Sequence, residues 1–164
     1  HAKGAEHREF CQIFGPDKIV PQFGMFLNYF MVRKVMCGEG LKRAAGTVTK
    51  KLSKWLAENG YVSKEEAEDG VEEGSEAVRG LPKADRAARI LSDHSDDVPF
   101  DFEDLPDEDY VDFGHFMIDR IESGKLWLTD SYGGKEELYG PIRVPASATK
   151  LLQPGWEISC GLGR

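Results

Sequence analysis

The sequence predicts an α+β protein with a helical bundle over residues 1–91, an acidic linker over residues 92–110 and a small β-barrel over residues 111–164. Apolar residues recur at helical spacing in the first part, whereas the last part has short extended runs separated by turns rich in glycine, aspartate and proline. Charge is sorted along the chain as well. Residues 1–60 carry ten Lys and Arg against five Asp and Glu, residues 61–110 carry five against seventeen, and the remainder carries six against seven. This distribution indicates separate surfaces for separate partners, or one block that neutralises another.

The first long helix is expected over residues 21–36. Its apolar side chains cover nearly the whole circumference at 3.6 residues per turn, which is typical of a helix inside a core. A shorter apolar helix is expected just before it, where Gly15 and Pro16 end the run. We therefore expect the long helix to lie in the core of the bundle.

The next helix should begin at Thr47, a good N-cap residue, and end at Asn59, because Gly60 can adopt the left-handed conformation that stops a helix. This helix has two faces. The apolar face, which we expect to anchor the helix in the fold, consists of Val48, Leu52, Trp55 and Leu56. The opposite, basic face consists of Lys50, Lys51 and Lys54.

Two further helices are expected before the linker. Ser63 and Glu66 form a capping box for a helix that runs to about Arg79 and is followed by Gly80. Pro82 suits the first turn of another helix over residues 82–91. The sequence thus predicts a break near Gly80.

Two stretches of the first half carry a recognisable pattern. Residues 26–30 read Phe-Leu-Asn-Tyr-Phe, and residues 47–61 form a helix that ends in Trp55-Leu56 and the turn Gly60-Tyr61. Residues 10 to about 80 thereby resemble the small helical core-binding domain that precedes the catalytic domain in tyrosine recombinases. The resemblance implies a bundle that contacts DNA phosphates, through Lys42, Arg43, Lys50, Lys51 and Lys54. Alternatively, the lysines of the basic face only keep the helix soluble.

Catalysis is not expected. The family that the chain resembles uses a nucleophilic Tyr, two Arg and a His-x-x-Arg element for catalysis. In this sequence the residues three positions after the four histidines are Gly4, Phe10, Asp97 and Ile118, so the His-x-x-Arg element is missing. We therefore expect no recombinase chemistry, no catalytic residues and no enzyme activity.

A metal-dependent enzyme is the third interpretation of the sequence. His94, Asp96 and His115 formally match the two-histidine, one-carboxylate pattern that binds ferrous iron. Only 19 positions separate Asp96 from His115, and too few strands are predicted around them to build the usual double-sheet scaffold. We expect no bound metal and no cofactor.

The cysteines and the longest apolar run indicate the cellular compartment of the protein. Cys11, Cys37 and Cys160 form no Cys-x-x-Cys pair, which indicates a reduced, cytoplasmic environment. The longest apolar stretch, residues 25–32, is far shorter than the roughly 20 residues that cross a bilayer, so no membrane span is expected. The chain opens on His1 rather than Met, so we expect either a trimmed chain or a fragment of a longer protein.

The acidic linker alternates aromatic or aliphatic residues with carboxylates. The apolar residues of this acidic segment, which continues into the start of the last part, are Phe100, Phe102, Leu105, Tyr110 and Phe113. Such a segment can dock its aromatics into a groove of a partner, fold back over the basic helix and screen it, or remain a solvated spacer.

The last part should form four strands, over residues 116–121, 126–129, 141–144 and 156–162, with a helical turn over residues 146–152. Residues 138–145, followed by residues 151–156, resemble the strand, helical turn and strand that end an SH3-like barrel. Four aromatic residues could present a peptide-binding surface there, or equally form the core and rim: Trp127, Tyr132, Tyr139 and Trp156.

The function expected from the sequence is a non-catalytic interaction module that associates with nucleic acid through the basic helix. The alternative is a protein adaptor that binds a peptide on the C-terminal barrel.

Overall fold

The computed structural model describes residues 13–96, 110–131 and 137–163. The fold combines a long helical region with a curled, four-stranded antiparallel half-barrel, which confirms the mixed helix and sheet predicted from the sequence. The chain divides into two compact units, one up to Pro82 and one from Lys83. We call them the helical unit and the sheet unit.

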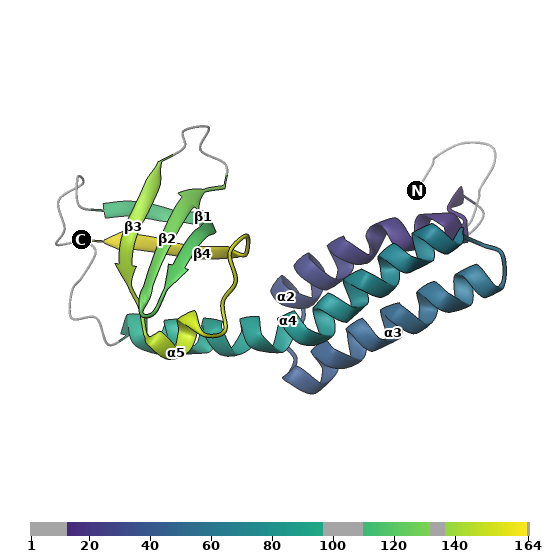
Figure 1. The fold of residues 1–164 in the computed structure, drawn as a ribbon, viewed down its shortest axis with the longest axis horizontal. Helices are drawn as coiled ribbons and strands as arrows, with labels where there is room; N and C mark the ends of the chain where they lie inside the picture. The colour runs from purple at the N-terminus through teal and green to yellow at the C-terminus, as the bar shows by residue number, and fades with distance from the viewer. Residues whose placement is uncertain (1–12, 97–109, 132–136, 164) are drawn as a thin grey trace, which may run out of the picture. The chain divides into compact units, whose positions relative to one another are not determined.

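The helical unit contains three helical segments that lie side by side (Figure 1). The first is built from short turns, Pro16–Lys18 (η1) and Val20–Gln22 (η2), a π-helical stretch Met25–Phe30 (η3), and Met31–Arg33 (α2). The other two segments are α3, Glu39–Glu58, and the part of α4 that precedes Lys83.

Only one side of the first segment is buried. Val20, Phe23, Leu27 and Met31 are buried, at intervals of three or four residues. The prediction that residues 21–36 are buried all round is wrong, because a small unit with three segments covers one side of each. The large side chains left exposed are Met25, Phe26, Tyr29, Phe30, Val32 and Met36.

Helices α3 and α4 approach each other through glycine. A Cβ atom built on Gly46 would lie 2.6 Å from the carbonyl oxygen of Gly74, and one built on Gly74 would lie 2.7 Å from the carbonyl oxygen of Gly46. The same face of α3 buries Thr49 and Ser53. Small residues therefore let the two backbones touch, which side chains at these positions would prevent.

This contact rotates α3 away from the orientation that the sequence predicts. Leu56 is buried, but Val48 is 61% exposed and Trp55 is 50% exposed. The prediction that the whole apolar face anchors the helix is therefore wrong. The buried face of α3 combines the small residues Gly46, Thr49 and Ser53 with Lys42 and Leu56. Leu52 packs against the core beside Leu56, so half of the predicted apolar face is exposed.

Helix α4, Lys64–Asp96, is one continuous helix. Its predicted capping box is confirmed: the Ser63 amide donates to Glu66 Oε2 at 2.8 Å, and the Glu66 amide donates to Ser63 Oγ at 3.1 Å. The predicted break near Gly80 is wrong, since Pro82 lies inside the helix and is buried. Residues 92–96, predicted as linker, are the last turns of α4, and residues 97–109 lie outside the described part of the chain.

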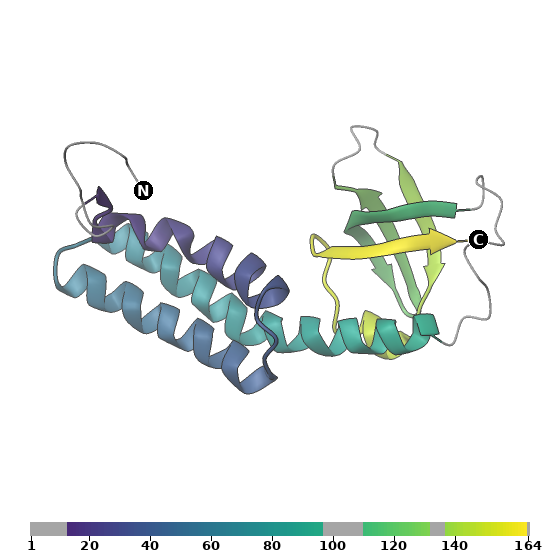
Figure 2. The same cartoon turned by 180° about the vertical axis from the view of Figure 1, so that it is seen from behind.

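The sheet unit has the strands β1 (Tyr110–Glu122), β2 (Lys125–Asp130), β3 (Leu138–Arg143) and β4 (Glu157–Gly163), with the short helix α5 (Ala146–Thr149) before β4. The strand order is β3-β2-β1-β4 and all neighbours are antiparallel. The first half of β1 pairs with β4 and the second half with β2, so the sheet curls (Figure 2). Its core consists of Phe116, Ile118, Leu126 and Leu128.

Within the described segments, no helix is long and apolar enough to cross a membrane.

One carboxylate is enclosed in the helical unit. Glu73 of α4 lies against the first segment, where its Oε1 would be 3.2 Å from a Cβ atom on Gly24, and its buried Oε2 has no hydrogen-bond partner among the described residues. Burial raises the pKa of Glu73, and the nearby charges of Glu76 and Asp69 raise it further.

Replacing Glu73 with Gln should therefore stabilise the protein near pH 7, by about 1 kcal/mol. Because the pKa of Glu73 is raised in the folded state, Glu73 lowers the stability of the fold least below its unfolded-state pKa. Its destabilising effect appears as pH rises through the folded-state pKa. The advantage of Glu73→Gln should accordingly vanish near pH 4. Urea unfolding at both pH values measures this, with the exposed Glu72→Gln as control. An equal gain at both pH values, or a gain shared by the control, would contradict it.

Candidate functional site

Three lysines of α3 line one open hollow on the helical unit. Lys50, Lys51 and Lys54 surround a space of about 380 Å³ together with Thr47 of α3 and with Val71 and Ser75 of α4. Lys51 and Lys54 are exposed and Lys50 is half-buried. None of these three lysines forms a hydrogen bond or ion pair with another described residue. We call this group the lysine row; its ammonium groups are available to an anion in solvent.

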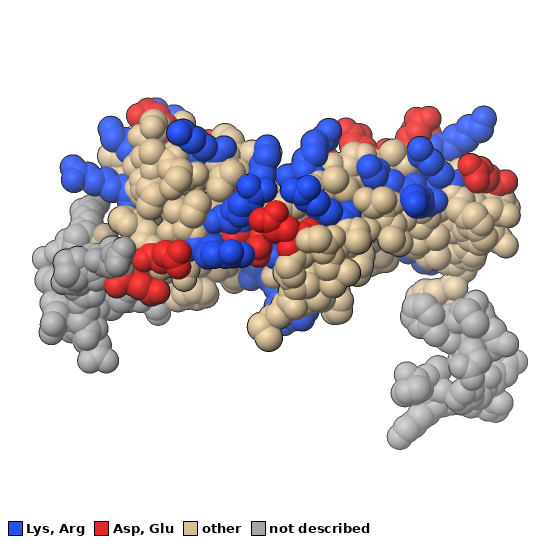
Figure 3. All heavy atoms as spheres, turned by 90° about the horizontal axis from the view of Figure 1, so that it is seen from below, with Lys and Arg blue, Asp and Glu red and all other residues tan. Residues whose placement is uncertain are grey.

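Backbone packing positions the lysine row. The stem of Lys50 runs along α4, where a Cβ atom on Gly74 would lie 2.7 Å from Lys50 Cγ. Lys54 follows Lys50 by one helical turn, and Lys51 lines the same hollow. Lys and Arg side chains stand along one margin of the helical unit with Asp and Glu side chains among them, beside a broad surface without charge (Figure 3).

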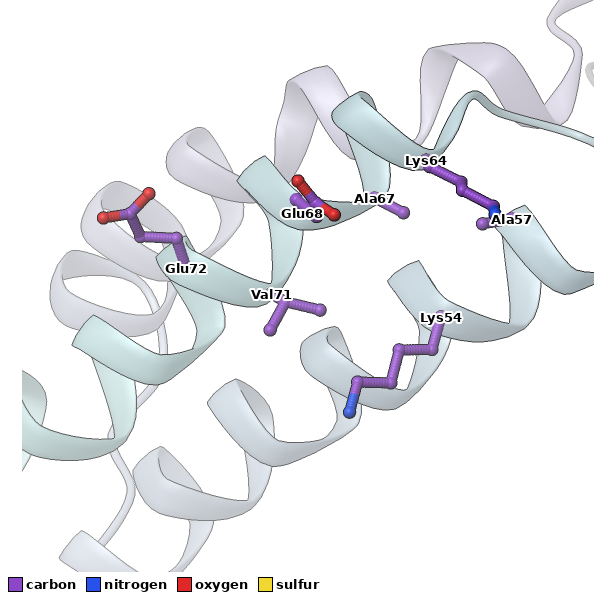
Figure 4. A pocket seen from close by; sticks show the side chains of 7 residues that line it. All are labelled: Lys54, Ala57, Lys64, Ala67, Glu68, Val71 and Glu72. Carbon is purple, nitrogen blue, oxygen red and sulfur yellow. The ribbon is translucent and has the colours of Figure 1, made fainter.

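A second hollow, of about 330 Å³, adjoins the first and shares Lys54 and Val71 with it. Its other lining residues are Ala57, Lys64, Ala67, Glu68 and Glu72. Figure 4 shows the side chain of Lys54 projecting from α3, while that of Glu72 points away from it on α4. The rim of this hollow carries both signs of charge, so the side that attracts anions is the α3 side.

The other two predicted phosphate contacts are placed differently. Lys42 is only 8% exposed, and Arg43 forms an ion pair with Glu39 at 3.8 Å, one helical turn away. An exposed pair of this kind adds little stability. The structure therefore brings together three of the five predicted basic residues, and these three form the lysine row.

Two aromatic rings stand at the end of α3, where Trp55 follows Lys51 of the lysine row by one helical turn. The rings of Trp55 and Tyr61 are about half exposed, and their centroids lie 5.6 Å apart with an interplanar angle of 36°. Sequence reasoning assigned Trp55 to the core and gave Tyr61 no role. The Gly60-Tyr61 turn was the available signal, because it returns an aromatic ring to the end of the helix.

The predicted peptide-binding aromatics are largely engaged in packing. Trp127 is 8% exposed, with Arg120 Cζ 3.8 Å from its ring centroid. Tyr139 packs edge-on against Phe116, its hydroxyl donates to Glu137 Oε2 at 3.1 Å, and burial raises its pKa.

The remaining two peptide-binding candidates have different outcomes. Trp156 is partly buried against the core of the sheet, and Tyr132 lies outside the described residues. A peptide-binding role for the four aromatics stays a prediction.

One polar cluster on the sheet contains a histidine, a serine and a glutamate. His115 Nδ1 lies 2.8 Å from Ser159 Oγ and 3.4 Å from Glu157 Oε1. A hydroxyl and a carboxylate must contact opposite ring nitrogens to act as nucleophile and orienting group, but here both contact the same nitrogen.

The other candidate reactive groups are the thiol of Cys160 and the predicted iron ligands. Burial raises the pKa of Cys160 to about 11, so its thiol is protonated at neutral pH and a poor nucleophile. His94, Asp96 and His115 do not form a cluster of three metal ligands in the described part of the chain.

Comparison of this chain with protein-family models, curated proteins and solved structures finds no match.

Proposed function

We propose that this protein is a cytoplasmic, non-catalytic interaction module that binds nucleic acid through the lysine row. The observation that carries the proposal is that Lys50, Lys51 and Lys54 line one open hollow without an ion-pair partner in the described residues. Because one helix carries the three lysines, their backbone is already ordered when they neutralise neighbouring phosphates. The resemblance of residues 10 to about 80 to the core-binding domain of tyrosine recombinases supports the same role.

The charge of the rest of the protein opposes this binding. The net charge is −8, and the second hollow exposes Glu68 and Glu72 beside Lys54. A polyanion must therefore approach from the α3 side, and its affinity must fall steeply with salt. Dissociation constants on the order of 10⁻⁴–10⁻⁶ M are expected, the range of non-specific binding.

Reversing two charges of the lysine row should abolish binding. We expect Lys50→Glu combined with Lys54→Glu to release duplex DNA at salt concentrations that retain the unaltered protein, because two phosphate contacts become repulsive. For the unaltered protein, three contacts predict that log K falls with log salt at a slope of about −2.7. Fluorescence anisotropy over a salt series measures both quantities.

The matched control is Lys125→Glu with Lys150→Glu, which changes net charge equally at two exposed lysines of the sheet unit. If this control weakens binding as much as the lysine-row variant, the effect belongs to net charge and the proposed site is wrong.

The second candidate is a protein adaptor that binds a peptide on a small β-barrel of which the curled sheet is part. It is favoured by an exposed ridge on β1, where Phe113 and Met117 flank His115 at alternate positions. Partner binding that ignores both salt and the charges of the lysine row would favour this adaptor over the nucleic-acid module.

A further inference from the structure

We propose that the lysine row and the rings of Trp55 and Tyr61 form one site for single-stranded nucleic acid. The inference rests on the proposed function and deepens it by naming the form of the ligand. In this site, a base stacks on the aromatic pair, and the adjoining phosphates contact the lysines.

The two rings are held in place without being needed in the core. The Asn59 side-chain amide donates to the carbonyl oxygen of Trp55 at 2.8 Å, and the Tyr61 amide donates to the carbonyl oxygen of Leu56 at 2.9 Å. Gly60, with φ of +71°, makes the turn between them. These contacts fix the backbone on both sides of the ring pair, while Trp55 and Tyr61 each remain about half exposed. A preset ring pair stacks on a base with a small loss of conformational entropy.

The lysines lie at the correct positions on α3 for a strand that stacks on Trp55. Lys51 precedes Trp55 by four residues, so the two share a helix face with their Cβ atoms about 5–6 Å apart. Lys54 and Lys50 continue the row from Lys51 toward α4, where all three line the same hollow. Aromatic rings beside a basic track are the combination that binds single strands without sequence preference.

The ring pair should make the site bind single strands more tightly than duplexes. In a duplex the faces of the bases are already stacked on one another, so only phosphates are available to this surface. In a single strand each base offers its face as well. The same site should therefore bind both forms through the lysines and only the single strand through the rings.

One charge in this region works against the ligand. Glu58 is exposed and follows Trp55 by three residues, so it shares the face of the rings. We expect Glu58→Gln to strengthen binding of both forms by about twofold to fivefold.

The test compares a 20-nucleotide DNA strand of mixed sequence with the duplex of the same sequence, by fluorescence anisotropy at low salt. The unaltered protein should bind the single strand about tenfold more tightly. Trp55→Ala should remove most of that preference and leave duplex affinity within twofold. The control is Val48→Ala, which removes exposed apolar surface from the same helix without removing a ring and should change neither affinity. Far-UV circular dichroism confirms that each variant is folded.

The outcomes distinguish this inference from the proposed function. If neither nucleic acid binds, or if an acidic peptide alone binds the rings, the proposed function fails. If both forms bind equally and Trp55→Ala changes nothing, the proposed function stands and this inference is overturned. An RNA strand of the same sequence should bind within twofold of the DNA strand, because rings and lysines contact bases and phosphates only. A strong sugar preference would overturn the assignment of recognition to those groups.

Discussion

Replacing Gly46 with alanine should lower the free energy of unfolding of the helical unit by about 2 kcal/mol. The new Cβ atom would lie 2.6 Å from the carbonyl oxygen of Gly74 and 2.9 Å from Val78 Cγ2. A backbone oxygen cannot move aside as a flexible side chain does, so the two helices must separate. Overpacking of this kind costs up to about 3 kcal/mol, and the better helix propensity of alanine returns about 1 kcal/mol.

The control lies in the same helix. Gly40 is in the first turn of α3, and a Cβ atom built there meets nothing within 4 Å. Gly40→Ala should therefore stabilise the unit by about 0.5–1 kcal/mol, through propensity alone. Urea unfolding followed by far-UV circular dichroism, to which the helices contribute most, measures both variants. A Gly46→Ala protein as stable as Gly40→Ala would show that the two backbones are farther apart than described.

The same pair of glycines explains which features of the helical unit the sequence could predict. The capping box of Ser63 and Glu66 and the stop at Gly60 depend on residues within one turn, so local patterns were sufficient. The orientation of α3 depends on Gly46 meeting Gly74, 28 positions later. Hydrophobic periodicity within one helix carries no information about that contact, and it placed Val48 and Trp55 inside.

The predicted break in helix α4 was wrong for a related reason. Pro82 removes one backbone hydrogen bond, which favours a helix boundary when only local cost is counted. In the structure Pro82 is among the most completely buried residues, so packing offsets that cost and the helix continues. The ends of β2, β3 and β4 were predicted within three residues, because alternation and turn residues are local signals, whereas β1 begins at Tyr110, six residues before its predicted start.

The residues of the candidate site also divide into those that local sequence patterns predict and those that they do not. Lys50, Lys51 and Lys54 were found because their spacing alone places them on one face of a helix. Lys42 and Arg43 lie outside the predicted helix, which was expected to begin at Thr47. The pair of Arg43 with Glu39, four residues earlier, was missed because α3 begins at Glu39, whereas the burial of Lys42 follows from tertiary packing. The ring of Trp55 was missed because an aromatic residue on an apolar face is usually core. Its exposure follows from the glycine contact.

Replacing Gly140 with alanine should lower the free energy of unfolding of the sheet unit by about 4 kcal/mol. Gly140 has φ of +155°, a conformation that residues with a Cβ atom rarely adopt, and forcing one into it costs on the order of 1–3 kcal/mol. The new atom would also lie 2.6 Å from Cδ1 of Trp127 and 2.9 Å from the carbonyl oxygen of Leu126. Trp127 cannot yield easily, because the guanidinium of Arg120 lies over its ring. Overpacking adds about 1–3 kcal/mol.

Gly155 provides the comparison that separates strain from collision. Its φ of +82° is also positive, but a Cβ atom built there meets nothing within 4 Å. Gly155→Ala should therefore cost only the backbone strain, about 1 kcal/mol. Both variants should be made with Trp55→Phe, so that tryptophan fluorescence during urea unfolding reports only Trp127 and Trp156 of the sheet unit. Equal losses for Gly140→Ala and Gly155→Ala would mean that the collision with Trp127 contributes nothing, and that the ring does not hold the close contact with Gly140 described above.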